Sequence, residues 1–329
     1  MLSIGADVCM AADDDFASYV HVVAAAIINQ DCQVLITRRP LDVHQGGTWE
    51  FPGGKVEWGE QPLEALRREL EEELDVTPLV SRPLIKFRYE YPDKRVLLDI
   101  WQVDRFHGRP VGREGQALKW VVQSKLKDFR FPEANLPILA ALRLPKQYLI
   151  TPDPGEDWQG FLVILRKALR NGCGLIRFRA YTLSDEDYCR CAKEVIQLCR
   201  DYSAYVLIDR RIDWVEMLGA DGIHLNSRSL MESQQRPLPL TQLVAASCHN
   251  LEELLQANRI GSDLAVVSPV KATRSHPGRD GLGWQEFAAL CDSAVMPVYA
   301  LGGMRPADMD RVWHHGGQGI AAIRSLWPA

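Results

Sequence analysis

Three glutamates that lie close together in the chain, Glu69, Glu72 and Glu73, have the chemical type and the spacing to hold a metal ion. Because they stand at positions i, i+3 and i+4, an α-helix places their carboxylates on one face. Like charges at this distance repel one another, so the arrangement favours a divalent cation that neutralises them. Carboxylate oxygens suit Mg²⁺ or Mn²⁺, and phosphate oxygens of a substrate can complete the shell. The alternative is a solvated surface helix rich in Glu and Arg.

The glutamates belong to a longer pattern of fixed spacing. Its positions are Gly54, Glu60, Arg68, Glu69, Leu70, Glu72, Glu73 and Val76. With this spacing the segment resembles the Nudix box, G-x5-E-x7-R-E-U-x-E-E-x-G-U, in which U is a bulky aliphatic residue. Asp75 stands where the box has glycine. Since this position ends the helix, and aspartate tolerates a left-handed cap better than most residues, we expect only a small loss of stability.

The resemblance extends to the MutT branch of the Nudix family and covers roughly residues 19–143. The matching stretches are ITRRP at 36–40, WEFPGGK at 49–55, YEYPD at 89–93, GREGQ at 112–116 and FPEANLPI at 131–138. MutT-like enzymes hydrolyse 8-oxo-dGTP to 8-oxo-dGMP and pyrophosphate, which cleans the nucleotide pool and avoids mutations in DNA. The resemblance therefore implies a hydrolase with a nucleoside triphosphate substrate and Mg²⁺, or Mn²⁺, as its cofactor.

The resemblance also implies roles for individual residues at the metal. The implied metal ligands are Gly54, through its carbonyl group, and Glu69, Glu72, Glu73 and Glu114. Glu114 has an alternative role as the group that activates the attacking water, and the sequence leaves this choice open. Arg68 is expected to orient the glutamates of the box as a supporting partner, and Glu60 to play a similar structural part.

Two further residues match family positions that bind the nucleotide. Asn135 matches the residue that reads the oxidised base, because an amide can pair with both the O6 acceptor and the N7–H donor of 8-oxoguanine. Ordinary guanine has an N7 acceptor instead, and leaving a buried polar group unpaired costs about 1–3 kcal/mol. The alternative for Asn135 is the N-cap of a helix over residues 136–142. Arg39 matches a phosphate or base contact, and its alternative is an exposed arginine at a strand end.

The elements that position these residues are expected to form a mixed α/β unit, with the metal helix against a sheet. Strand-like runs occupy residues 20–28, 33–37, 84–91, 95–103 and 118–122. A polar turn at residues 29–31 joins the first two strands, and a loop with Gly46 and Gly47 precedes the box. Pro62 stands near the first turn of the metal helix.

A second pattern begins near residue 147 and repeats a short apolar run, followed in most cases by a helix-like segment. The apolar runs cover residues 148–151, 174–178, 205–208, 222–225, 243–247, 264–268, 298–301 and 319–323. The helix-like segments include residues 158–170, 185–201 and 307–315. Eight such runs predict a compact TIM (β/α)8 barrel over residues 147–329, after a linker at 144–146. The alternative is an open doubly wound sheet, which is less favoured because no G-x-G-x-x-G follows the first run.

Several stretches of this second half are shared with one family. They are YLITPD at 148–153, RFRAYTLSD at 177–185, LIDRRID at 207–213, GADGIHL at 219–225, SCHN at 247–250, SPVKATRS at 268–275, ALGGM at 300–304 and GIAAIRS at 319–325. With them the half resembles thiamine-phosphate synthase, which joins a pyrimidine diphosphate to a thiazole phosphate with Mg²⁺. The resemblance implies a phosphate site of backbone N–H groups at the ends of the last two strands. The implied phosphate contacts are Arg179, Thr273, Ser275, Gly302, Gly303 and Arg324.

This half departs from the family pattern where the family holds its metal. Tyr181 replaces a lysine, Arg210 replaces a metal-binding Asp, Ser227 and Ser229 replace Gln and Asp, and the T-x-T-K loop reads Thr273-Arg274-Ser275-His276. Both metal carboxylates of the family are therefore absent. Asp209 lies close enough in sequence to replace one of them, but Arg210 beside it opposes a cation.

The pattern is closer to the thiazole tautomerase branch of the superfamily, which needs no metal and uses a histidine as acid and base. His249 matches that histidine. His224 is expected to point into the barrel as a packed, hydrogen-bonded side chain. We therefore expect the barrel to take a thiazole phosphate or a similar monophosphate, and not to make thiamine phosphate.

Composition limits the partners and the compartment. A chain of 329 residues with 47% hydrophobic residues can fill two cores. The net charge of −5 leaves no broad basic surface for polymeric nucleic acid, and no apolar run is long enough for a membrane span. Residues 1–18 lack the features of a signal peptide and are expected to form a flexible tail. The eight cysteines are scattered without a C-x-x-C pair, which predicts free thiols in a cytoplasmic protein; the oligomeric state stays open.

The sequence thus predicts an 8-oxo-dGTP-type Nudix pyrophosphohydrolase fused to a synthase-like barrel. One alternative is an enzyme of thiamine metabolism, whose Nudix half hydrolyses thiamine-type pyrophosphates while the barrel acts on thiazole phosphate. A second alternative makes the barrel a non-catalytic sensor, which binds a phosphate ligand and regulates its neighbour.

Overall fold

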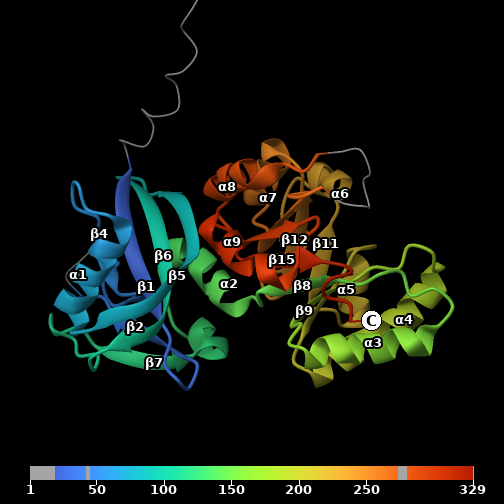
Figure 1. The fold of residues 1–329 in the computed structure, drawn as a ribbon, viewed down its shortest axis with the longest axis horizontal. Coiled ribbons are helices and arrows are strands. Elements are labelled where there is room, and N and C mark those ends of the chain that lie inside the picture. Colours follow the sequence, from blue (N-terminus) through green and yellow to red (C-terminus); the bar gives the residue numbers. More distant parts are fainter. Residues whose placement is uncertain (1–18, 42–44, 273–279, 329) are drawn as a thin grey trace, which may run out of the picture.

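The computed structural model describes residues 19–41, 45–272 and 280–328, and contains two α/β units, of which the second is a closed barrel (Figure 1). The predicted fold class is therefore confirmed. The expected tail at residues 1–18 lies outside the described residues, and the boundaries at 143 and 147 stay predictions. Within the described ranges, no helix is both long and apolar enough to cross a membrane.

The first unit is built on two sheets, with strand orders β4-β1-β6-β5 and β3-β2-β7. Its strands are β1 (Val20–Ile27), β2 (Gln33–Arg38), β3 (Trp49–Glu50), β4 (Gly53–Lys55), β5 (Thr77–Glu90), β6 (Arg95–His107) and β7 (Leu118–Val122). Strands β1 and β6 run parallel, whereas β5 and β6 form an antiparallel pair. The middle of β1 is apolar on both faces because Val23 and Ala25 belong to the core beneath the metal helix, while Ala24 and Ala26 belong to a second core on the opposite side.

The metal helix is α1 (Pro62–Leu74), and its sequence sets both of its ends. Pro62 occupies the first turn, where its missing N–H costs nothing, and Gln61 and Glu64 form a capping box. The helix ends at Asp75, which adopts the left-handed conformation with φ of 59°, as the sequence predicts. Its apolar stripe, Ala65, Leu66, Leu70 and Leu74, is buried against β1, so the polar face is left for the glutamates.

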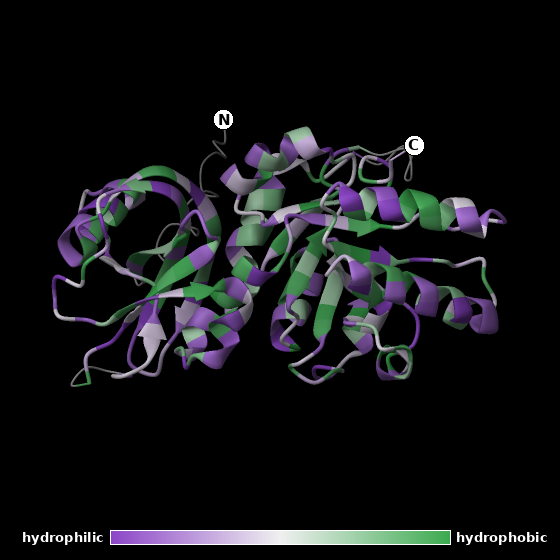
Figure 2. Cartoon of the chain, turned by 90° about the horizontal axis from the view of Figure 1, so that it is seen from below, coloured by the Kyte–Doolittle hydropathy of each residue, from purple (hydrophilic) through white to green (hydrophobic). Residues whose placement is uncertain are grey.

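The second unit is a barrel of eight parallel strands that closes where β15 pairs with β8. Its strands are β8 (Gln147–Ile150), β9 (Leu175–Phe178), β10 (Tyr205–Ile208), β11 (Gly222–Leu225), β12 (Leu243–Cys248), β13 (Leu264–Val267), β14 (Val298–Leu301) and β15 (Gly319–Ala322). The outer helices are α3 (Trp158–Arg170), α4 (Asp185–Asp201), α5 (Asp213–Leu218), α6 (Ser227–Glu232), α7 (Leu251–Arg259), α8 (Gly283–Ser293) and α9 (Met309–His314). Figure 2 shows the hydrophobic strands enclosed by helices whose outer faces are hydrophilic.

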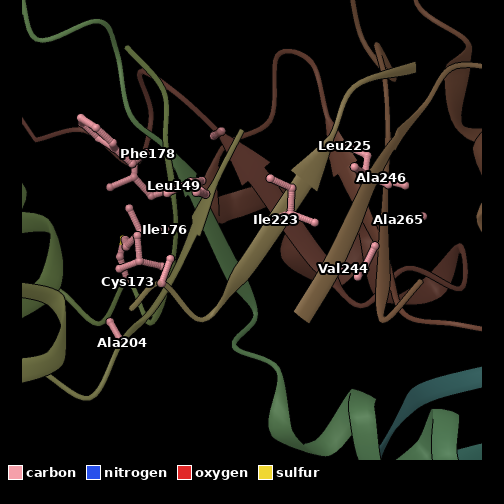
Figure 3. Packing of buried hydrophobic residues seen from close by; sticks show 14 of the residues in the cluster. Leu149, Cys173, Ile176, Phe178, Ala204, Ile223, Leu225, Val244, Ala246 and Ala265 are labelled. Carbon is pink, nitrogen blue, oxygen red and sulfur yellow. The ribbon is translucent and has the colours of Figure 1, made fainter. Parts of the chain in front are cut away.

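Alternation along each barrel strand decides which side chains reach the interior. Ile176 and Phe178 of β9 point outward and pack with Ile223 and Val244 in the layer beneath the helices (Figure 3). Leu175 has the opposite parity and belongs to the interior cluster. Polar side chains that share the parity of Leu175 along β9 are therefore directed to the barrel axis.

Two strands are longer than the sequence indicates: β6 runs to His107 instead of residue 103, and β5 differs more. A strand is predicted from residue 84, whereas β5 begins at Thr77 and includes Pro78 and Pro83. Prolines argue against a central strand, but β5 lies at the edge of its sheet, where a missing N–H is tolerated. The pairing with β6 shifts its register beside both prolines.

A short helix, α2 (Leu136–Arg143), lies between the two units (Figure 1). It follows the 3-10 turns η2 (Gln123–Asp128) and η3 (Glu133–Asn135), and it leads through Leu144 into β8. Strand β5 of the first unit packs against α2 on one side and against α8 and α9 of the barrel. The 3-10 turn η4 (Pro306–Asp308) precedes α9.

Candidate functional site

The carboxylate at the centre of the first site is Glu73, whose Oε2 accepts a hydrogen bond of 3.2 Å from the backbone N–H of Gly53. Burial, with a smaller contribution from the charges of Glu114 and Glu69, raises the pKa of Glu73 to about 8. A carboxylate held among other carboxylates in this way is destabilised in its ionised form. A bound cation is the simplest means of stabilising it.

Gly54 packs directly against the helix face. A Cβ atom at this position would lie 2.3 Å from the carboxyl carbon of Glu69, so a larger residue would force the Glu69 side chain to turn away. Strand β4 pairs with β1 and is thereby fixed in front of α1. The fold thus brings the backbone of Gly54 and two of the predicted glutamate ligands together.

Arg68 organises the acidic face. Its guanidinium donates to both carboxylate oxygens of Glu60 at 3.0 Å, to Glu69 at 2.8 Å and to the carbonyl of Lys55 at 3.0 Å. A weaker contact of 3.3 Å reaches Glu72, whose side chain is 62% exposed. Hydrogen bonding to Arg68 lowers the pKa of Glu60. These contacts connect β4, the loop before α1 and the helix, as an orienting residue requires.

Glu114 lies in the loop between β6 and β7, far from α1 in sequence. The loop is attached to Glu73, because the N–H of Arg113 donates to the Glu73 carbonyl at 3.0 Å and the Gln116 amide donates to the same carbonyl at 3.2 Å. The Gln116 side chain also accepts from the N–H of Glu114 at 2.9 Å. The charge of Glu114 therefore acts on Glu73 although its own side chain is exposed.

The donor set fits a hard divalent cation by its chemistry. Carboxylates of Glu69 and Glu73 lie at the backbone of Gly53 and Gly54, and the pKa of Glu73 is raised mainly by burial and further by the charges of Glu114 and Glu69. Within the described ranges, however, no three acidic, histidine or cysteine side chains already converge as a finished metal cage. Glu69 and Glu72 face Arg68 instead. Binding of an ion requires these side chains to turn from Arg68 towards Glu73.

Glu50 is a site residue that the sequence reasoning missed. Its carboxylate forms an ion pair with Arg39, and burial raises its pKa. Its charge also contributes to the raised pKa of Glu73, so it lies between the predicted nucleotide contact Arg39 and the metal ligands. The sequence context could have indicated this role, because Glu50 stands between Trp49 and Phe51 at the end of a strand, where an unpaired charge is costly.

Asn135 is the last residue of η3 and occupies the N-cap position of α2, yet its side chain makes no capping hydrogen bond. The capping alternative for this residue is therefore not favoured by the geometry. Its side chain is half-buried, next to a region of aromatic residues in which Phe51 stacks on Phe131 with ring centroids 5.6 Å apart. An amide that is free of the helix backbone can bind another polar partner.

The second site is a pocket of about 910 Å³ at the carboxyl ends of the barrel strands. Its lining includes all predicted phosphate contacts that the structure describes: Arg179, Gly302, Gly303 and Arg324. Thr273 and Ser275 lie outside the described residues. His249 also lines the pocket, as do Arg177 and Arg305, which the sequence reasoning did not select. No acidic side chain occurs among these described lining residues, so the pocket suits an anion.

Arg177 stands two residues after Leu175 on β9, so its side chain also points into the barrel. This alternation in the sequence could have identified Arg177 as a pocket residue. It is buried, and its Nε and one terminal nitrogen donate to Oδ2 of Asp209 at 3.0 and 2.9 Å. The same nitrogen donates to the hydroxyl of Tyr181 at 2.9 Å. Asp209, 1% exposed, is thereby paired with a fixed cation.

Arg210 points away from the pocket. Its guanidinium donates to Asp185 and to the carbonyls of Ala180 and Leu183, each at 2.7 Å, and it lies over the ring of Tyr188. It therefore braces the loop after β9. Arg210 is not among the residues that line the pocket.

The two barrel histidines have different surroundings. His249 is exposed, and its Nδ1 lies 2.6 Å from the carbonyl oxygen of Ser268. Because a carbonyl only accepts, Nδ1 carries the hydrogen and Nε2 of the neutral ring remains a proton acceptor. His224 is buried between the Tyr148 hydroxyl and Ser247 Oγ, both at 2.8 Å, and burial lowers its pKa. His224 is thus the packed, neutral histidine that the sequence predicts.

Comparison with known proteins agrees with both halves of this description. Residues 23–141 match the family model described as NUDIX domain, and residues 147–326 match the model described as thiamine monophosphate synthase. Over 124 residues the chain is 40% identical to the 8-oxo-dGTP diphosphatase of Escherichia coli (strain K12), covering 38% of this chain and 96% of that protein. Over 119 residues it is 38% identical to the CTP pyrophosphohydrolase of the same organism, covering 36% of this chain and 88% of that protein.

The barrel has relatives of its own. Over 182 residues the chain is 33% identical to the protein named "Putative thiamine-phosphate synthase 2" of Aquifex aeolicus (strain VF5), covering 55% of this chain and 97% of that protein. The chain spans about half the length of three other relatives named thiamine-phosphate synthase.

The fold and the acidic face define an enzyme, a hydrolase of the Nudix class that carries a second, barrel-shaped unit. The chain belongs to the Nudix family through its first unit and to the thiamine monophosphate synthase family through its barrel.

Proposed function

We propose that the first unit is a Mg²⁺-dependent pyrophosphohydrolase that converts 8-oxo-dGTP to 8-oxo-dGMP and pyrophosphate. The observation that carries this proposal is the placement of Glu69 and Glu73 against the backbone of Gly53 and Gly54, with Glu114 close enough for its charge to raise the pKa of Glu73. The 40% identity to an 8-oxo-dGTP diphosphatase supports the choice of substrate. Mn²⁺ is the alternative metal.

In this proposal Glu69, Glu72, Glu73, Glu114 and the Gly54 carbonyl hold the metal. A divalent cation supplied there offsets the charge that builds on the phosphates and lowers the pKa of the attacking water. Arg68 keeps the box glutamates on the correct side of α1 through its bonds to Glu60 and Lys55. Water attacks the substituted β-phosphorus, and the nucleoside monophosphate leaves. Glu114 is a candidate for the general base that activates this water, as an alternative to its role as a metal ligand.

Asn135 recognises the oxidised base in this proposal, and Arg39 contacts the phosphates or the base. The absence of a capping bond at Asn135 supports this role, because its amide keeps both a donor and an acceptor for the substrate. The ion pair with Glu50 gives Arg39 a defined direction. Guanine in place of 8-oxoguanine turns one of the two pairings at the amide repulsive, which favours the oxidised nucleotide.

For the barrel we propose binding of a thiazole phosphate or a similar monophosphate without a metal, with Gly302, Gly303 and Arg324 at the phosphate and His249 as acid and base. The tautomer of His249, fixed by Ser268, supports a proton-transfer role. We propose no efficient synthase activity, because Tyr181 and Arg210 stand at family positions for a lysine and a metal ligand.

Two alternatives are kept because specific observations favour them. The barrel's family favours thiamine metabolism, in which the Nudix unit hydrolyses thiamine-type pyrophosphates. The 38% identity to a CTP pyrophosphohydrolase favours a different nucleotide.

Substrate profiling of the full chain tests these choices together. With Mg²⁺ present, kcat/KM is measured for 8-oxo-dGTP, dGTP, CTP and thiamine pyrophosphate. We expect the highest value for 8-oxo-dGTP. A higher value for CTP or thiamine pyrophosphate would replace the proposed substrate by one of the alternatives. Added thiazole phosphate that changes the Nudix rate would support the sensor role.

A further inference from the structure

We propose that the barrel forms part of the specificity apparatus of the Nudix unit, because its Gln318 clamps α2, the helix that begins at Asn135. Gln318 is in this view a positioning residue for recognition of the base. The inference rests on the proposed function, since it takes Asn135 as the residue that reads the base.

Gln318 reaches across the interface to the C-terminal end of α2. Its side-chain Nε2 donates to the carbonyl oxygen of Ala141 at 2.7 Å and to that of Leu144 at 3.2 Å. The last carbonyls of a helix have no partner within the helix, so an outside donor must satisfy them. Water cannot easily serve here, because Gln318 is only 4% exposed.

Gln318 is itself held firmly by the barrel. It directly precedes β15, its N–H donates to the carbonyl of Val298 at 2.7 Å, and its carbonyl accepts from the indole nitrogen of Trp313 at 3.1 Å. The ring of Trp313 lies under the guanidinium of Arg82, 4.5 Å away, and near the ammonium of Lys146, 5.0 Å away. Groups from both units thus surround the clamp.

A second tether joins the same end of α2 to the barrel. Arg143 approaches Asp263, with 3.9 Å between the guanidinium nitrogen and Oδ1. Asp263 is fixed by Arg236 at 2.6 Å and by the N–H of Val244 at 2.7 Å. Asp263 and Gln318 both precede barrel strands, so both tethers lie at the end of the barrel opposite the pocket.

The helix is short enough to transmit the clamp to the nucleotide site. The eight residues of α2 span about 12 Å, so the helix moves as one unit. A displacement of its C-terminal end therefore shifts Asn135 by nearly the same distance. On its other face α2 buries Ile138, Ala141 and Leu142 in the Nudix core. Two hydrogen bonds from Gln318 set the position of the helix along its axis. Figure 1 shows α2 between the two units.

The test uses the full chain with Gln318→Met, which keeps the length of the side chain and removes the amide. We expect the ratio of kcat/KM for 8-oxo-dGTP to that for dGTP to fall about tenfold, since misplacement by about 1 Å can cost up to 10²-fold. The loss should appear in KM for 8-oxo-dGTP, with the Mg²⁺ concentration for half-maximal rate unchanged. Amide hydrogen exchange in residues 136–143 should become faster.

The matched control is Lys86→Ala, which removes an ion pair of 3.5 Å to Asp292 across the same interface without touching α2. This variant should keep the wild-type ratio and the wild-type exchange in α2. A folded Gln318→Met protein with an unchanged ratio and unchanged α2 exchange would overturn the proposal, and so would an equal loss in Lys86→Ala.

If Gln318→Met does not fold, Arg143→Ala is used in its place. Arg143 is partly exposed, so its replacement leaves the packing of the core unchanged. A fall in the ratio of about two- to threefold supports the clamp, as expected for a weaker tether, and no change in ratio or exchange contradicts it. An unmodified chain without preference for 8-oxo-dGTP would contradict the proposed function itself. Faster α2 exchange in Gln318→Met would then still support the clamp.

Discussion

The two sites of this molecule carry opposite charge. At α1, Glu69 and Glu73 lie against the backbone of Gly53 and Gly54, and burial together with the charge of Glu114 destabilises the ionised form of Glu73. At the barrel mouth, Arg179 and Arg324 line a pocket without an acidic lining residue among those described. A phosphate can be bound in either way, through a recruited cation or through fixed guanidinium groups and backbone N–H donors. The difference predicts a metal requirement in the first unit and none in the second.

The largest expected effect comes from removing a carboxylate from the acidic site on α1. Glu73→Gln keeps the shape of the side chain but removes its charge, and should lower kcat for 8-oxo-dGTP by about 10³-fold or more. Glu69→Gln should act in the same direction. Both are measured over a Mg²⁺ titration, with circular dichroism to check the fold.

The control for this pair is Glu71→Gln on the same helix, where the carboxylate bonds to Arg67 at 3.0 Å and Thr77 at 2.8 Å instead of facing the glycine turn. It should retain nearly full activity. Full turnover in a folded Glu73→Gln protein would contradict the metal assignment.

The next prediction addresses the cationic side. The full chain should bind inorganic phosphate equally well in EDTA and in Mg²⁺, and Arg324→Ala should weaken that binding. It should not form thiamine phosphate, because losing two electrostatic contacts to the departing pyrophosphate costs about 10⁴-fold or more in rate. Calorimetry and a direct synthase assay measure the two quantities. Mg²⁺-dependent thiamine phosphate formation, or growth of a synthase-deficient strain, would show that the barrel retains the chemistry.

The substitution Asn135→Ala tests whether Asn135 recognises the oxidised base in the Nudix unit. It should reduce kcat/KM for 8-oxo-dGTP about tenfold to a hundredfold more than for dGTP, the range set by leaving one or more polar groups of the base unpaired. Steady-state kinetics with both nucleotides give the two losses. Equal losses for both would mean that Asn135 serves only the helix.

The smallest effect concerns pH and stability. Since the pKa of Glu73 in the folded chain is raised to about 8, the stability linked to its proton is present below about pH 4.5 and is lost as pH rises through about 8. In EDTA, the Tm of the unmodified chain should therefore fall more between pH 5 and 8 than that of Glu73→Gln. Mg²⁺ should reduce this fall. Equal slopes for the two proteins would show that Glu73 is not strained.

Sequence predicted most of the fold because each element has a local signal. The parity of the barrel strands and the spacing of the box glutamates are such signals. Glu50, Arg177 and Gln318 were missed because their importance comes from partners distant in the chain: Arg39, Asp209 and the carbonyl groups at the end of α2. The length of β5 was missed because its edge position, which tolerates proline, is a property of the sheet.

The central claim is that the acidic face of α1 needs a divalent cation to hydrolyse a nucleoside triphosphate. The most direct test is a Mg²⁺ titration of the metal-free full chain with 8-oxo-dGTP, with the products separated by chromatography. The account predicts no turnover in EDTA, a saturable rise with Mg²⁺, and 8-oxo-dGMP and pyrophosphate as the products. Turnover that is independent of metal, or stepwise release of single phosphates, would contradict it.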